Sequence, residues 1–263
     1  MLVSHRPGAL TAWGNAYLSG DSSLDDAVDE VVGADPLDRV VGVPAESGDV
    51  SLAVALGRLR AQGVVALRLT LPEPGDPTGL PGPASVTTAA LVARAAVLTV
   101  GPVDVSSYAL LPTAVTSASG DVVRWDVVEV AHSTAPFGLP TLSEADRALA
   151  EALRSTTSDL DALDVARGRD AVGPRLVALD RSLRRIELPR SLPARAQRMV
   201  ATSSRLLGVL TLAAEDDGGA VTATEAARRL DALRPLRSAA RYALCAGYSA
   251  AAEPSPGRGT AAR

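Results

Sequence analysis

The sequence predicts an α/β lobe followed by an all-α antiparallel helical bundle, and three observations lead to that division. Short β-branched runs, each with the length of a buried strand, occur only in the first half. From Thr141 onward, leucine and alanine recur every three or four residues with no further strand pattern. A proline-containing segment separates the halves. We therefore expect the lobe at 1–135, a linker at 136–140, the bundle at 141–252 and a disordered tail at 253–263.

The first half contains runs typical of a mixed sheet of about five short strands. They lie at 39–43, 63–71, 97–100, 108–116 and 122–130. A Ser/Gly-rich turn separates the last two runs and predicts an antiparallel hairpin. Pro112 predicts that its strand is an edge strand or is bulged. Alternation in the last run places Trp125 on a buried face and Arg124 and Asp126 on a wet one.

Helices are expected to flank this sheet. They are predicted at 9–19, 24–32, 51–62 and 86–96. The first places Trp13 and Tyr17 on one face, which predicts that both aromatic side chains pack inward. The strand at 39–43, the helix at 51–62 and the strand at 63–71 form a βαβ pattern. That pattern predicts a parallel pair of strands joined by a right-handed crossover.

The second half has the pattern of long amphipathic helices. They are predicted at 141–163, 174–186, 193–215 and 222–252. Thr141 and Glu144 form a capping box at the start of the first. The helix at 193–215 is apolar around much of its circumference, so we expect it at the centre of the bundle. Pro235 predicts a kink or break in the last helix.

Composition excludes several chemistries. The chain has no lysine, which excludes a Walker A loop, a Schiff-base enzyme and a protein-kinase site. Two histidines and one cysteine exclude a Cys/His zinc cluster and an intrachain disulfide, and Cys245 is expected to be a small core residue. With neither a signal-peptide pattern nor an 18-residue apolar run, the chain is predicted to be cytoplasmic and to avoid the membrane. We assign no cofactor or metal.

The best candidate site is the Pro/Gly loop at 72–85, which leaves a predicted strand where ligands sit in α/β sheets. It offers carboxylates, a hydroxyl and glycine N–H groups, with Ser85 as the expected cap of the next helix and its anion-attracting end. The candidate ligand-binding residues are Glu73, Gly75, Asp76, Thr78, Gly79, Gly82 and Ser85. The competing interpretation is that the loop is a rigid connector.

Charge is divided unevenly along the chain. Residues 1–164 carry a net charge of −12, and residues 165–205 carry +7. Arg181, Arg184 and Arg185 are therefore weak candidates for binding an anionic partner. The competing interpretation is local ion pairing on a solvated face, for example between Asp180 and Arg184. Nucleic acid is disfavoured because no aromatic side chains lie among these arginines.

No catalytic residue is assigned. His132 stands beside hydroxyl residues, but adjacent strand residues point to opposite faces and a triad needs groups from separate segments. His5 lies in a segment expected to fray. The acidic runs at 25–30 and 215–217 have the spacing of solvated helix ends, which does not match a calcium loop.

Three segments carry a resemblance to known proteins. These are the loop at 75–83, the turn at 216–221 and the helix break at 233–236. With them the chain resembles conserved uncharacterised proteins of high-GC actinobacteria over most of 8–250. The resemblance implies no activity.

Two functions are consistent with these observations. The first is a non-catalytic binding or scaffolding protein whose helical half and Pro/Gly loop contact a protein partner or, through alanine-rich helix faces, a second copy. The alternative is a small-molecule-binding protein or enzyme with its site around Glu73, Asp76 and Thr78. A concave pocket with convergent polar groups at the loop would favour the second.

Overall fold

The computed structural model describes most of the chain. The described residues are 5–33, 39–117, 120–131, 138–162, 169–215 and 223–253. His132, part of the predicted linker and the tail beyond Glu253 lie outside them. The chain forms two compact units. The second contains Pro140–Glu187 and Ala194–Gly247, and the first contains the preceding residues together with Leu188–Pro193 and the segment from Tyr248 onward.

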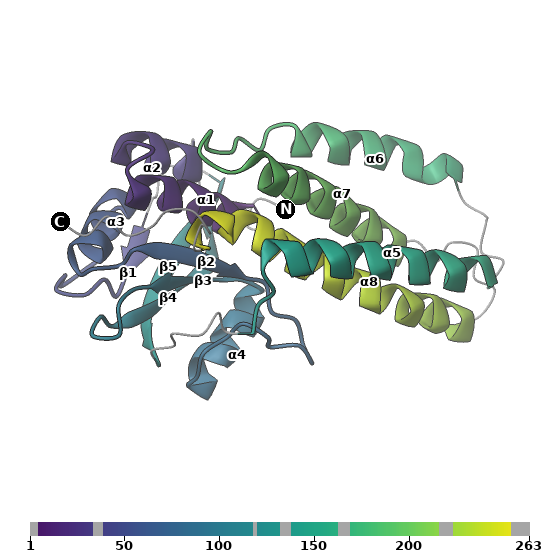
Figure 1. Ribbon diagram of the computed structural model, residues 1–263, viewed down its shortest axis with the longest axis horizontal. Helices are drawn as coiled ribbons and strands as arrows, with labels where there is room; N and C mark the ends of the chain where they lie inside the picture. The colour runs from purple at the N-terminus through teal and green to yellow at the C-terminus, as the bar shows by residue number, and fades with distance from the viewer. Residues whose placement is uncertain are drawn as a thin grey trace. The chain divides into compact units, whose positions relative to one another are not determined.

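The first unit is built on a five-stranded mixed sheet, as the sequence predicts (Figure 1). Its strands are β1 (Arg39–Val41), β2 (Ala66–Thr70), β3 (Ala96–Val100), β4 (Ser107–Ser117) and β5 (Gly120–Val130). The spatial order is β1-β5-β4-β3-β2. β4 and β5 form the predicted antiparallel hairpin, and β1 alone runs parallel to its neighbour, β5.

The predicted parallel pairing of β1 with β2 is wrong. The two strands lie at opposite edges of the sheet, and the successive pairings make them run in opposite directions. β1 has three residues, so its apolar pattern does not specify a neighbour. Its central residue, Val40, lies opposite Trp125 of β5 and is bridged on its outer side to Val50. The crossover rule fixes handedness only once the pairing is known.

Four helices cover the sheet. They are α1 (Arg6–Ser19), α2 (Leu24–Val32), α3 (Leu52–Ala61) and α4 (Ala84–Ala93). The hydroxyls of Ser23 and Ser51 accept backbone N–H groups at the starts of α2 and α3. Helices α1 to α3 lie over one face of the sheet, and α4 lies over the other (Figure 1). Val86 and Ala90 of α4 pack there against a cluster that includes Leu111.

The buried face of α1 combines Leu10 and Asn15 with several small residues, among them Gly14. A side chain at Gly14 would overlap Leu67 of β2, so the helix approaches the sheet closely only with glycine at that position. Trp13 and Tyr17 are half-buried, which corrects the prediction that both aromatics pack inward. Tyr17 instead lies under the guanidinium of Arg60, 4.8 Å from the ring centroid.

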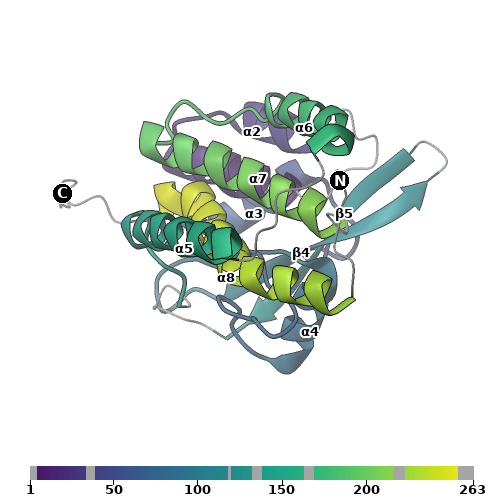
Figure 2. The same ribbon diagram turned by 90° about the vertical axis from the view of Figure 1, so that its right-hand side faces the viewer.

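The hairpin of β4 and β5 extends beyond its neighbours (Figure 2). β3 pairs only with Ala109 and Leu110, so Pro112 lies where β4 has a single partner strand. The prediction of an edge or bulged strand is nevertheless wrong, because β4 lies inside the sheet and its register with β5 runs through Pro112 without a bulge. Trp125 is 2% exposed, and Arg124 and Asp126 lie on the more exposed face, as predicted.

The second unit is helical. Its helices are α5 (Leu142–Ala162), α6 (Arg169–Leu183), α7 (Ala194–Glu215) and α8 (Ala223–Ser249), whose last residues belong to the first unit. The predicted capping box is present: the N–H of Thr141 donates to Glu144 at 2.9 Å, and the hydroxyl of Thr141 accepts the N–H of Glu144. α8 continues through Pro235, so the predicted break is absent. Leu233 and Leu236 are buried in the core on either side, which keeps the helix continuous.

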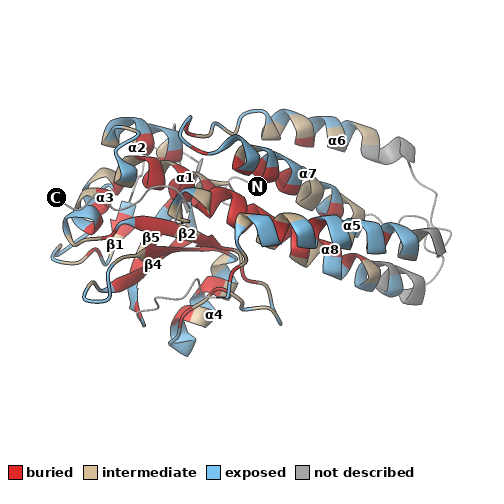
Figure 3. Cartoon of the chain, in the orientation of Figure 1, coloured by how far each residue is buried: buried red, intermediate tan, exposed pale blue. Residues whose placement is uncertain are grey.

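α8 contributes more to the core of this unit than α7, contrary to the sequence prediction (Figure 3). Its buried residues there are Leu233, Leu236, Ala239, Ala240, Ala243 and Ala246. Leu206 and Leu207 of α7 are only half-buried beside this cluster. Cys245 is buried, as expected. No helix in the described ranges combines the length and apolarity needed to cross a membrane.

Candidate functional site

The Pro/Gly loop consists of two consecutive turns. In the first, Glu73 and Asp76 exchange backbone hydrogen bonds of 3.1 and 2.8 Å, with Pro74 second and Gly75 third at φ 84°. This is the residue pattern of a type II turn. In the second, the N–H of Leu80 donates to Pro77. The loop is therefore closed by its own backbone.

The turns are fixed to the end of β2. The hydroxyl of Thr70 donates to the carbonyl of Thr78 at 3.1 Å, and the N–H of Thr78 donates to the Asp76 carboxylate at 3.4 Å. Gly79 has a φ of 91°, and a Cβ there would lie 2.8 Å from the Thr70 hydroxyl and 2.9 Å from Leu139. Only glycine fits this position without strain. The arrangement brings Glu73, Asp76 and Thr78 together.

Two predicted residues take other roles. Ser85 is not the cap of α4: Pro83 occupies the N-cap position, and no side chain there accepts a hydrogen bond. Ser85 lies exposed in the first helical turn, because the helix starts two residues earlier than the pattern indicated. Gly82 is exposed, and its carbonyl accepts the N–H of Ala131 at 3.3 Å. This bond ties the loop to the end of β5.

The three candidate arginines lie at the end of α6. Arg181 is in its last turn, Arg184 and Arg185 follow directly, and all three are exposed. Within the part of the chain that the structure describes, none of their guanidinium groups forms an ion pair. Asp180 pairs with Arg205 of α7 at 2.9 Å, so the predicted Asp180–Arg184 pair is wrong. α6 packs beside α7, and the carboxylate turns to that neighbour.

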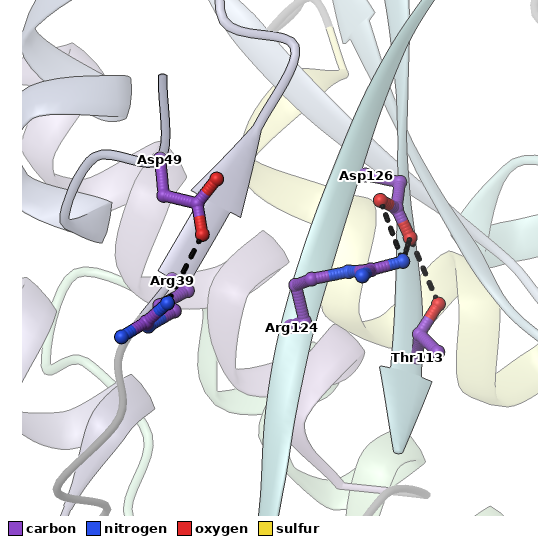
Figure 4. A network of polar contacts seen from close by, with 5 residues as sticks. All are labelled: Arg39, Asp49, Thr113, Arg124 and Asp126. Atoms are coloured by element: carbon purple, nitrogen blue, oxygen red, sulfur yellow. Dashed lines mark hydrogen bonds and ion pairs between the residues drawn. The ribbon is translucent and has the colours of Figure 1, made fainter. Parts of the chain in front are cut away.

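Sequence reasoning missed a polar network across β1, β5 and β4 (Figure 4). The register places Arg39 directly opposite Arg124, where like charges destabilise a sheet. Each arginine forms an ion pair with a different carboxylate: Arg39 pairs with Asp49 at 3.2 Å, and Arg124 pairs with Asp126 at 3.1 Å. Thr113 donates to Asp126 at 2.9 Å. The alternation in β5 signals half of this network, but nothing in three-residue β1 signals its register.

Within the described ranges, four groups have shifted pKa values. Burial lowers the pKa of His5 and raises the pKa of the Tyr248 phenol. Burial also lowers the pKa of Arg68, while the charge of Glu253 raises it. Hydrogen bonds from Thr141 lower the pKa of Glu144, the backbone N–H contributing most. Among the described residues, no three histidine, cysteine, aspartate or glutamate side chains gather as metal ligands do.

These features define a class: an α/β unit with a mixed sheet and a rigid turn pair, joined to a helical unit. The chain belongs to the Rv1486c-like protein family. The family's N-terminal domain matches residues 8–140, and its C-terminal domain matches residues 143–245.

Two relatives come from Mycobacterium tuberculosis. The chain is 28% identical over 280 residues to "Uncharacterized protein MT1533" of strain CDC 1551 / Oshkosh. It is 29% identical over 283 residues to "Uncharacterized protein Rv1486c" of strain ATCC 25618 / H37Rv. Each comparison covers 92% of this chain and 95% of the relative. The predicted resemblance to uncharacterised actinobacterial proteins is confirmed. No solved structure matches the chain significantly.

Proposed function

We propose that this chain is a non-catalytic binding protein whose arginine surface, formed by Arg181, Arg184 and Arg185, takes an acidic protein partner. The observation that carries the proposal is the clustering of three exposed arginines within five residues at the end of α6. Among the described residues, none of the three has an ion-pair partner. Exposed guanidinium groups of one sign attract carboxylates and favour encounter with an acidic surface.

The helix dipole explains only part of this cluster. A cation in the last turn of a helix is stabilised by the unpaired carbonyls there, by about 0.3–1 kcal/mol. Arg181 occupies that turn, but Arg184 and Arg185 lie beyond it. Three like charges within five residues repel one another, and a negatively charged partner relieves that repulsion.

The loop at 72–85 is proposed as a second, rigid contact element. Its turns are closed by their own backbone bonds and fixed to β2 through Thr70. A loop held in one conformation loses little entropy on binding a partner surface. The alanine-rich face of α8, by contrast, is buried in the core of the second unit, so we do not propose that face for self-association.

The small-molecule alternative rests on one observation. Glu73 and Asp76 lie half-buried on one turn beside Thr78, where paired carboxylates favour a cationic ligand. A thermal-shift screen of cationic metabolites tests this function. Stabilisation of the wild type that Asp76→Ala abolishes would support it, and equal stabilisation of both proteins would contradict it.

The main proposal is tested by fluorescence anisotropy with a labelled peptide of about twenty glutamates at about 0.15 M salt. The triple variant Arg181→Gln, Arg184→Gln, Arg185→Gln should bind at least about tenfold more weakly than the wild type. The matched control carries the same charge change at exposed positions elsewhere, Arg94→Gln, Arg147→Gln and Arg228→Gln. Equal loss in both variants would contradict a specific surface, as would tighter binding of a single-stranded oligonucleotide.

A further inference from the structure

β2 is an edge strand, and its outward backbone groups need partners other than a neighbouring strand. The side chain of Asn15 in α1 satisfies Leu67 completely. Its amide oxygen accepts the Leu67 N–H at 2.7 Å, and its amide nitrogen donates to the Leu67 carbonyl at 2.9 Å. The amide thus takes the place of a peptide group of a missing strand.

The next outward N–H of β2 is satisfied from far along the chain. The N–H of Leu69 donates to the hydroxyl of Ser249, the last residue of α8, at 2.9 Å. Ser249 is 5% exposed, so this bond is buried. Two different elements, α1 and the end of α8, therefore close neighbouring positions of one strand edge.

Two further contacts hold the same segment to the first unit. The ring of Tyr248 lies against Gly8, where an added Cβ would be 2.5 Å from the ring carbons. Glu253 interacts electrostatically with Arg68 of β2. Between them, the short helix η2 (Ala250–Ala252) contacts both α1 and β2.

We propose that residues 248–253 form a strap that closes the edge of β2 and can release it, so that a segment following the helical unit completes the fold of the α/β unit. The matched family domain ends at residue 140 and does not include the strap. In this chain, the part that the N-terminal domain matches therefore leaves the Leu69 N–H without its partner.

The two closures differ in strength. Asn15 lies inside a helix and makes two bonds to one residue, whereas Ser249 makes a single bond at the end of α8. Opening the strap breaks this one bond and also moves the buried Tyr248 ring away from Gly8, while both bonds from Asn15 stay in place. Release of the strap uncovers the N–H of Leu69 while Leu67 stays covered. An uncovered N–H on a strand edge is a site for pairing with another strand.

Amide hydrogen exchange of the full chain, followed by NMR, tests the strap. Ser249→Ala should speed exchange of the Leu69 amide about fivefold or more and leave Leu67 unchanged. Asn15→Ala should speed exchange at Leu67. Equal Leu69 exchange in the wild type and Ser249→Ala would overturn the proposal.

A pair of shortened chains provides a second test. The chain ending at Gly247 lacks the strap, and the chain ending at Glu253 keeps it. The first should lose Leu69 protection, and the second should match the full chain. Retained protection in the chain ending at Gly247 would overturn the proposal. If the chain ending at Gly247 does not fold, the exchange rate of the Leu69 amide in Ser249→Ala decides whether the strap protects this amide.

Discussion

Replacing Asn15 by alanine tests the closure of the sheet edge. Asn15 is 3% exposed, and its amide holds both backbone groups of Leu67 at 2.7 and 2.9 Å. Alanine leaves a buried N–H and a buried carbonyl without these bonds, each at about 1–3 kcal/mol. Alanine is also the better helix former by about 0.5 kcal/mol. We therefore expect the variant to lose about 2–5 kcal/mol of unfolding free energy.

Denaturation followed by tryptophan fluorescence measures this loss. Both tryptophans of the chain, Trp13 and Trp125, belong to the first unit, so the signal reports on that unit. Asn15→Asp is the isosteric control: it keeps an acceptor for the Leu67 N–H but loses the donor to the carbonyl, so it should also destabilise. A loss below about 0.5 kcal/mol in the alanine variant would refute the reasoning.

Three further predictions follow from single contacts. Gly8→Ala should lower the melting temperature because the added methyl meets the ring of Tyr248. The control Gly57→Ala faces open space in α3 and should raise the melting temperature or leave it unchanged. Equal shifts in the two variants would contradict the contact between Gly8 and Tyr248. Burial raises the pKa of Tyr248, so stability should fall as pH rises above about 10, and Tyr248→Phe should lack this fall in alkaline denaturation. Hydrogen bonds lower the pKa of Glu144, so its contribution should be present above pH 5 and be lost as pH falls; Glu144→Gln should lack that loss when helix content is followed by circular dichroism.

Local signals in the sequence predict most elements of this fold. The β-branched runs and the capping box at Thr141 act between near neighbours, and the structure confirms them. Pairing of strands is different, because a three-residue strand such as β1 has too little pattern to specify its neighbour. The sequence therefore predicts a mixed sheet and yet gives a wrong partner for β1.

In the candidate site, too, contacts between near neighbours are predictable from the sequence and long-range contacts are not. The turn pair around Asp76 is predictable from proline and glycine spacing, which acts locally. The contacts of Asn15 and Ser249 with β2 span 52 and 180 residues, and a lone asparagine inside a helix is the only signal for the first. The predicted ion pair between Asp180 and Arg184 is wrong for the same reason, because Asp180 pairs with Arg205 of the adjacent helix α7.

The proposal that the end of α6 receives an acidic partner is tested most directly by one titration. The glutamate peptide is added to the wild type and to the Arg181, Arg184, Arg185 glutamine variant under identical salt. We predict saturable binding by the wild type and its loss in the variant, with the dispersed-charge control close to the wild type. Indistinguishable curves for all three proteins would contradict the account.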